Sequence, residues 1–296
     1  AGSFYFYTMI NKEAPIGLFD SGVGGTSIWR EIHQRLPFEH TLYLADSQNA
    51  PYGAKSVKEI IALSVKNTEL LLAQGCKLIV VACNTATTNA IEPLREKYSV
   101  PFIGIEPAIK PAALQSKTKS VGILATKGTL NSALFHETAN QYGGSINRIE
   151  VVGEGLVPLI EQGVVNGPEI EALLIKYLSP MIQAGVDHIV LGCSHYPYLI
   201  PTIKRLIPEH INIIDSGFAV ARQTQTILAE KGLLRHEPNS DQTRPIETSA
   251  HTSELSSVRL EFWTNADPKP LTQLLNLNAQ NNDIEERDLN ILQKDF

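Results

Sequence analysis

Two short apolar runs, each leading into a cysteine and then into polar residues, constrain the fold of this 296-residue chain more than any other feature. Leu78–Val81 lies just before Cys83, and residues 188–191 lie just before Cys193. Runs this short and this rich in valine, isoleucine and leucine predict buried β-strands. Ligands bind beyond the carboxyl ends of the strands in open parallel sheets, so we expect each cysteine at a ligand-binding edge.

The spacing of these runs indicates that one α/β unit occurs twice. The two cysteines are 110 positions apart, and the first strands expected in each half, at Ile16 and Val121, are 105 positions apart. Strands alternate with helical segments in both halves, which favours parallel sheets. We therefore predict an α/β fold of two pseudo-symmetric parallel-sheet domains, with the active site in the cleft between them.

The same pattern sets the expected domain boundaries. The first domain is discontinuous and comprises residues 14–106 plus 217–296, because a helix expected over 218–231 returns to it. The second domain comprises residues 107–216. Residues 1–13 are expected to be an N-terminal extension or a cloning remnant, with Met9 as a candidate native start.

The C-terminal region gives weaker signals. Residues 235–257 are rich in serine, threonine, proline and asparagine, which predicts a flexible loop. Residues 258–264 alternate between apolar and polar side chains and predict one more strand. Residues 270–292 predict an amphipathic helix.

Composition excludes several classes of protein. The net charge is −6 at pH 7 and no basic run is present, so nucleic acid is not an expected partner. No segment reaches the roughly 18 consecutive apolar residues of a membrane span. Three cysteines in a chain of this length do not make a disulfide framework, and we expect free thiols in the cytoplasm.

Cys83 and Cys193 carry the clearest chemical signal. A single cysteine on an apolar strand is usually a small core residue, but two at equivalent strand ends favour a function. A thiol with an ordinary pKa of about 8.5 can act as base or acid near neutral pH, and a helix N-terminus stabilises the thiolate. Two thiols flanking one carbon suit removal of a proton from one face and its return to the other. Cys76, at the opposite end of its strand, has no expected role.

Asp20, Ser21 and His195 lie at the same predicted edges. Asp20 or Ser21 is explained about equally well as an N-cap of the following helix or as a site residue. Asp20 would then relay a proton or orient a substrate ammonium group. His195 is either structural or keeps Cys193 poised for proton transfer. Glu161 by itself predicts a surface carboxylate.

Several other side chains and backbone groups can donate hydrogen bonds to a carboxylate ligand without a fixed cation. They are Asn84, Thr85, Ser194, Thr126 and the backbone at Tyr52 and Gly53. Thr126 is equally explained as the start of a capped turn, and Asn84 as a turn residue. The glycines of residues 22–25 allow a positive φ or a close backbone approach, but they match neither a Walker loop nor a dinucleotide fingerprint. With no C-x-x-C pair, we expect no metal, and no lysine suggests a pyridoxal phosphate site.

Four motifs, taken together and in this order, resemble the cofactor-independent aspartate/glutamate racemase family, and within it the glutamate racemases. They are Phe-Asp-Ser-Gly-Val-Gly-Gly at 19–25, Pro-Tyr-Gly at 51–53, Ala-Cys-Asn-Thr-Ala at 82–86 and Gly-Cys-Ser-His-Tyr-Pro at 192–197. The likeness runs from about Ile16 to Lys231. The chain departs from the family at Ser194, where threonine is common, and over residues 45–50.

The resemblance implies interconversion of L- and D-glutamate without a cofactor, with D-glutamate supplied to peptidoglycan. It implies that Cys83 deprotonates the D enantiomer and Cys193 the L enantiomer, assisted by Asp20, Glu161 and His195. It assigns substrate contacts to Asp20, Ser21, Tyr52, Gly53, Asn84, Thr85, Thr126, Ser194 and His195. It also implies a homodimer, and a cell-wall precursor activates some branches of the family.

Three other functions stay open at this point. One is a racemase of aspartate or another acidic amino acid in the same family. A second is a non-catalytic, two-domain protein that binds an amino acid. A third is a thiol-based lyase or decarboxylase that uses only one cysteine.

Overall fold

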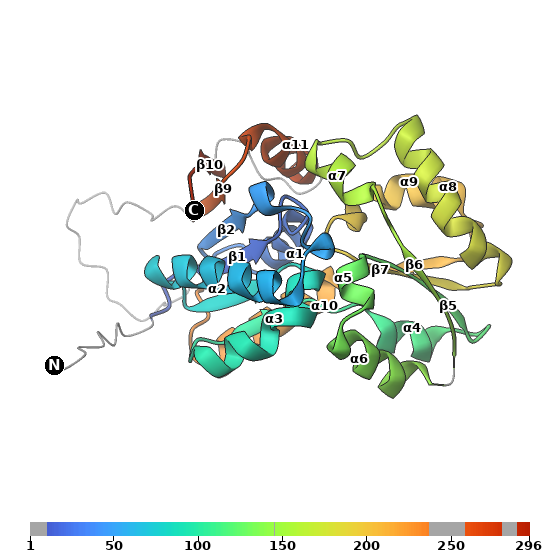
Figure 1. The fold of residues 1–296 in the computed structure, drawn as a ribbon. Helices are drawn as coiled ribbons and strands as arrows, with labels where there is room; N and C mark the ends of the chain where they lie inside the picture. The colour runs from blue at the N-terminus through green and yellow to red at the C-terminus, as the bar shows by residue number, and fades with distance from the viewer. Residues whose placement is uncertain (1–10, 145, 237–257, 280–288) are drawn as a thin grey trace, which may run out of the picture.

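The computed structural model describes residues 11–144, 146–236, 258–279 and 289–296, and it contains two β-sheets flanked by helices (Figure 1). The flexible loop expected over 235–257 lies almost wholly outside the described residues. Every strand pairing within the two sheets is parallel, as predicted.

The first sheet has six strands in the order β10-β9-β2-β1-β3-β4, and the second has four in the order β6-β5-β7-β8. The strands are β1 (Ile16–Asp20), β2 (Thr41–Ala45), β3 (Leu78–Val81), β4 (Phe102–Gly104), β5 (Ser120–Ala125), β6 (Asn147–Val152), β7 (His188–Gly192), β8 (Asn212–Ile214), β9 (Leu260–Thr264) and β10 (Leu289–Gln293). The order β2-β1-β3-β4 repeats as β6-β5-β7-β8, which confirms the predicted duplication and the fold class.

Helices connect these strands and cover the sheets. They are α1 (Thr26–Arg35), α2 (Val57–Ala73), α3 (Asn84–Lys97), α4 (Ile109–Gln115), α5 (Lys127–Leu130), α6 (Ala133–Gly143), α7 (Leu156–Glu161), α8 (Pro168–Gln183), α9 (Ile200–Leu206), α10 (Gly217–Glu230) and α11 (Pro268–Ala279), with short 3₁₀ turns η1 (Ser47–Asn49), η2 (Tyr52–Ala54) and η3 (Tyr196–Leu199). Local signals set several ends: Ser56 and Glu59 form a capping box at the start of α2, and Pro168 opens α8.

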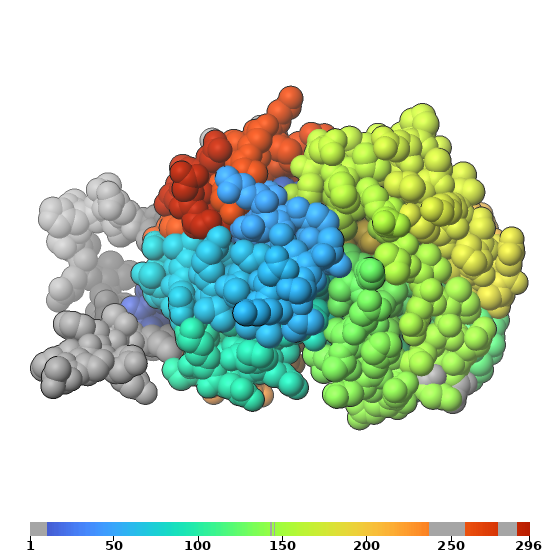
Figure 2. Space-filling view, in the orientation of Figure 1, coloured from blue at the N-terminus to red at the C-terminus, as the bar shows by residue number. Residues whose placement is uncertain are grey.

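Alternation along the strands divides the core of the first sheet into two layers. Ile16 and Leu18 face a cluster that includes residues of α1 and α10, whereas Phe19 faces a cluster with residues of α2 and α3. The first cluster continues into the second sheet through residues such as Leu124, so apolar packing joins the two domains. Their surfaces meet along a seam, blue and teal against green, in Figure 2.

The chain returns to the first sheet after β8, because α10 packs against α1. This agrees with the discontinuous first domain, although the boundaries at 106/107 and 216/217 stay a prediction. Among the helices of the described residues, none combines the length and the hydrophobicity that crossing a bilayer requires.

The helix predicted over residues 270–292 is wrong in its second half. Helix α11 ends at Ala279, and residues 289–293 instead form β10, which pairs in parallel with β9. The edge of β9 pairs with the backbone of this segment, whereas a short helix without tertiary packing is only marginally stable in water. Leu289 and Ile291 contact one apolar cluster and Leu292 the other, so this segment follows the period of a strand.

Candidate functional site

Cys83 lies between the end of β3 and the start of α3. The helix begins at Asn84, and Cys83 is its N-cap residue. The backbone N–H of Ala86 donates to the Cys83 sulfur at 3.4 Å, and the Ser21 hydroxyl lies 3.7 Å from the same sulfur. The sulfur therefore sits at the positive end of a helix, where a thiolate is stabilised.

Cys193 occupies the corresponding place after β7 in the second sheet. Its sulfur lies 3.7 Å from Nδ1 of His195, and the Ser194 hydroxyl lies 3.4 Å from the same nitrogen. Cys83 and Cys193 are 4% and 6% exposed, so both thiols are shielded from bulk water.

Asp20 connects the two halves of the site. Its carboxylate is fully buried at the end of β1 and accepts hydrogen bonds from the backbone N–H groups of Gly22 and Gly25. Those two donors bind Oδ2, which also lies 4.0 Å from His195 Nε2, whereas Oδ1 accepts from the Ser194 hydroxyl at 3.2 Å. Asp20 thus binds the backbone of the loop before α1 and also faces residues of the second domain. The N-cap alternative is wrong, because Gly25 is the N-cap residue of α1 and no side chain caps that helix.

Glu161 is not a surface carboxylate, contrary to what its local sequence predicts. Its side chain is 13% exposed, and Oε1 lies 2.5 Å from Nε2 of His195. The backbone N–H of Val23 donates to Oε1 at 2.8 Å, and the Ser47 hydroxyl donates to Oε2 at 2.9 Å. Tertiary contacts from the first domain bury this carboxylate, and sequence periodicity does not report such contacts.

The glycines of residues 22–25 are required by close approach. None of them is among the described residues with positive φ, so that expected role is wrong. A Cβ on Gly22 would lie 2.0 Å from Oε1 of Glu161, and a Cβ on Gly24 would lie 2.2 Å from Nδ1 of His195. The absence of side chains lets this loop contact Glu161 and His195 of the second domain.

A second group of candidate residues meets where the two domains touch. The hydroxyls of Thr85 and Thr126 lie 2.8 Å apart, and a Cβ on Gly53 would lie 2.9 Å from Cβ of Thr126. Thr126 also caps α5, so the capped-turn alternative holds alongside this contact. The side-chain oxygen and nitrogen of Asn84 are buried and have no hydrogen-bond partner among the described residues. A buried amide without a partner is costly, which marks Asn84 as a group available to a ligand.

Tyr52 enters the site differently from the other candidates. Its hydroxyl donates to Oδ2 of Asp46 at 2.5 Å, so the ring is fixed and the hydroxyl is already used. Asp46, Ser47 and Asn265 were missed from the sequence. Asp46 had a usable signal, since it follows β2 just as Asp20 ends β1.

Burial and neighbouring charge tune the ionisable groups of the site. Burial raises the pKa of Asp20, although His195 opposes this effect. Burial, followed by the charge of Asp20, raises the pKa of Cys83 well above its ordinary value, so this group rests as a thiol. Burial alone would favour neutral His195, but hydrogen bonds with Cys193 and Glu161 outweigh it and raise the pKa of the imidazole. Burial also raises the pKa of Cys76 to about 12, which makes that thiol inert.

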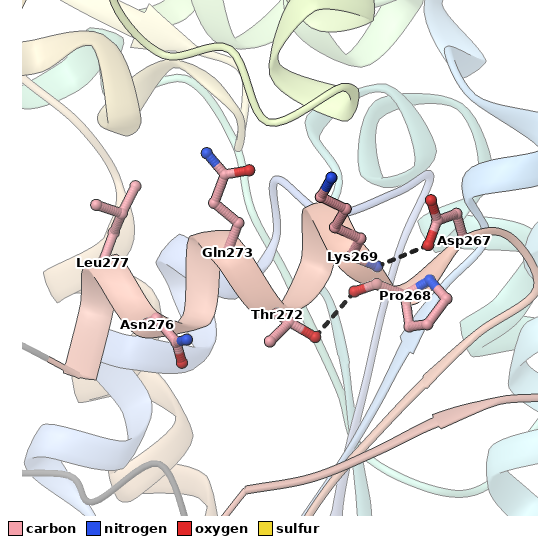
Figure 3. Close-up of a pocket in the computed structure, with 7 residues that line it drawn as sticks. All are labelled: Asp267, Pro268, Lys269, Thr272, Gln273, Asn276 and Leu277. Atoms are coloured by element: carbon pink, nitrogen blue, oxygen red, sulfur yellow. Dashed lines mark hydrogen bonds between the residues drawn. The ribbon is translucent and has the colours of Figure 1, made fainter.

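Two further observations delimit the site. Within the described ranges, no three histidine, cysteine or acidic side chains are grouped so as to hold a metal ion. A surface pocket along α11 is lined by side chains of that helix and the residue before it, and none of the candidate residues belongs to it (Figure 3).

Fold and site together define a class: a two-domain α/β enzyme with paired buried cysteines at equivalent strand ends. The model of the Asp/Glu/hydantoin racemase family matches residues 16–224, and the chain belongs to this family. It is therefore an isomerase, and the resemblance stated from its motifs is confirmed.

Individual relatives agree with this assignment. The chain is 46% identical to a glutamate racemase of Cupriavidus pinatubonensis over 256 residues, which are 86% of this chain and 94% of that protein. An Escherichia coli glutamate racemase, solved with L-glutamate and the activator UDP-MurNAc-ala, is 31% identical with a TM-score of 0.75, covering 95% of this chain and 98% of that one. A Bacillus anthracis glutamate racemase gives a TM-score of 0.76 at 26% identity, over 97% and 99% of the two chains.

Proposed function

We propose that this chain interconverts L-glutamate and D-glutamate by moving the α-proton between Cys83 and Cys193. The observation that carries the proposal is that these thiols follow corresponding strands, β3 and β7, and that both contact residues around Asp20. The glutamate racemases similar to this chain indicate the substrate.

The two thiols have different roles in each direction of the proposed reaction. Cys193 as thiolate takes the proton from L-glutamate, with His195 and Glu161 stabilising the ionised sulfur through the contacts at 3.7 and 2.5 Å. Cys83, whose raised pKa keeps it a thiol, gives its proton to the opposite face and leaves D-glutamate. The reverse reaction exchanges the two roles. The buried carboxyl group of Asp20 contacts Ser194, and we assign it to the substrate ammonium group.

The carbanion formed between these steps requires stabilisation by the protein. We assign the substrate carboxylates to hydroxyl, amide and backbone donors at Ser21, Gly53, Asn84, Thr85, Thr126 and Ser194. The partnerless amide of buried Asn84 supports this assignment. Tyr52 contributes a fixed ring and backbone. Preorganised donors in a water-excluding site lower the cost of developing charge.

Further parts of the proposal concern the setting of the reaction. We assign the product to peptidoglycan synthesis, the protein to the cytoplasm and its assembly to a homodimer. The complex of the Escherichia coli relative with UDP-MurNAc-ala supports the idea that a cell-wall precursor activates this chain as well.

Incubation with L-glutamate in heavy water, without added cofactor, tests the proposal. We expect α-deuteration and loss of optical rotation, because one thiol removes the proton and the other returns a solvent-derived one. Cys83→Ser and Cys193→Ser should each lower the rate by at least about a hundredfold. Cys76→Ser is the matched control and should retain activity.

Two of the three alternatives predict different outcomes in this experiment. A binding protein would produce neither deuteration nor loss of rotation, and an aspartate racemase would exchange aspartate in preference to glutamate. Loss of activity in a folded Cys76→Ser variant would contradict the assignment of the two thiols.

A further inference from the structure

Glu161 receives its hydrogen bonds from both domains. It ends α7, and His195 Nε2 of the same domain contacts Oε1 at 2.5 Å. The other two donors are the Val23 N–H on Oε1 and the Ser47 hydroxyl on Oε2, both from the first domain. With both oxygens engaged, the carboxylate cannot rotate away from His195 without losing hydrogen bonds.

The turn that carries Ser47 is held by a residue from the C-terminal segment. Asn265 is 1% exposed, and its amide nitrogen donates to Oδ1 of Asp46 at 2.6 Å. Its amide oxygen accepts from the backbone N–H of Gln48 at 2.9 Å. Asn265 therefore binds the residues before and after Ser47, and it lies outside residues 16–224, which the family model matches.

The same segment also contacts the chain just beyond Glu161. Gln273 projects from α11 in Figure 3 and donates to the Gly163 carbonyl at 3.0 Å. A Cβ on Gly163 would lie 2.4 Å from the Gln273 amide oxygen, so the Gln273 side chain lies directly against the Gly163 backbone. The segment from β9 to α11 thus supports both partners of the Ser47–Glu161 hydrogen bond.

We propose that Ser47 is a positioning residue for the relay Glu161–His195–Cys193, and that Asn265 holds Ser47 in place. The proposal rests on the proposed racemisation. The Ser47 hydroxyl fixes Oε2, which leaves Oε1 facing His195. The imidazole is thereby kept protonated and oriented toward the Cys193 sulfur. Because Ser47 and Glu161 belong to different domains, this hydrogen bond exists only while the domains are in contact.

The test compares isotope effects for the two enantiomers. Ser47→Ala should lower kcat/KM by roughly tenfold, the effect of losing one hydrogen bond to a charged group. The fall is the same in both directions, because the enantiomers have equal free energy. The step at Cys193 becomes more rate-limiting. The primary isotope effect should therefore rise with α-deuterated L-glutamate and fall with α-deuterated D-glutamate.

Matched variants separate positioning from packing. Ser47→Thr keeps the hydroxyl and should retain wild-type isotope effects. Ser47→Val has nearly the same shape as Ser47→Thr but lacks the hydroxyl, and it should behave like Ser47→Ala. Asn265→Ala should change the two isotope effects as Ser47→Ala does, upward with α-deuterated L-glutamate and downward with α-deuterated D-glutamate. Ser179→Ala removes a hydroxyl that donates to the Ile175 carbonyl within α8, and it should change neither effect.

Three results would overturn the inference. They are unchanged isotope effects in Ser47→Val, a shift in the opposite sense, or failure of Ser47→Thr to differ from Ser47→Val. A wild-type protein that does not exchange the α-proton at all would refute the proposed function instead, so the two failures are distinguishable.

Discussion

At the scale of single residues, the site depends on glycines, which have no side chain, as much as on the residues that react. Gly22 and Gly24 leave room for the Glu161 carboxylate and the His195 ring of the other domain. The sequence shows the glycines but not their reason, since both close contacts join residues more than 130 positions apart. Cys83, Cys193 and Asp20 were predictable, because each lies at the end of a strand whose apolar run is visible.

Gly22→Ala tests this account. The added methyl group should displace the carboxylate of Glu161, which is the flexible end of a side chain, so the fold should survive. We expect the racemisation rate to fall by at least about tenfold. Kinetics and thermal unfolding measured on the same sample check both parts.

Gly144→Ala is the control, since among the described residues a Cβ there meets only the Asn140 carbonyl at 3.3 Å. Full activity in a folded Gly22→Ala variant would show that Glu161 does not need its present position.

At the scale of elements, one carboxylate anchors the connection that leads into β5. Asp187 accepts hydrogen bonds from the Ser116 hydroxyl and from the N–H groups of Lys117 and Thr118, and it contacts His188. Burial favours the neutral acid, but the hydrogen bonds, led by that from His188, outweigh it and hold the pKa of Asp187 well below its ordinary value.

The depressed pKa gives a stability that depends on pH. It is present above the unfolded value of about 3.9 and is lost as pH falls below that value toward the folded one. Asp187→Asn should therefore lower the urea midpoint at neutral pH, and the difference from wild type should narrow in acid. Urea titrations at several pH values measure it, and a difference independent of pH would contradict this account.

Local sequence patterns predict the ends of some helices but not a strand whose partner is distant in the sequence. The capping box of α2 and the proline at the start of α8 were predictable, because their signals lie within one turn of helix. Strand β10 was not, because its partner β9 lies at a distant place in the chain and decides its conformation.

At the scale of the whole molecule, the local charge near the domain contact is opposite in sign to the net charge of the chain. The chain carries −6 at pH 7 and would repel an acidic amino acid. A surface cavity next to Gly53 and Gly128 is lined by Lys55 of the first domain and Lys127 of the second, together with Glu154. With two lysines against one glutamate, the charged side chains that line this cavity are positive on balance.

Replacing both lysines by alanine should weaken capture of glutamate. We expect kcat/KM to fall by about three- to tenfold through KM, with kcat unchanged, and its dependence on ionic strength to flatten. Lys231→Ala, at the end of α10, is the control for loss of one positive charge. An equal loss in that variant, or an unchanged salt dependence, would contradict local steering.

The sequence by itself determined the duplicated parallel α/β architecture, the two cysteines at strand ends and the family, because these depend on periodicities and motifs of a few residues. The tertiary structure decided which groups assist each thiol: it buried Glu161 against Val23 and Ser47, and it brought Asn265 to the turn beside the site. The physical reason is that desolvation and hydrogen bonding between distant segments exist only after the domains pack together, and no local pattern encodes them.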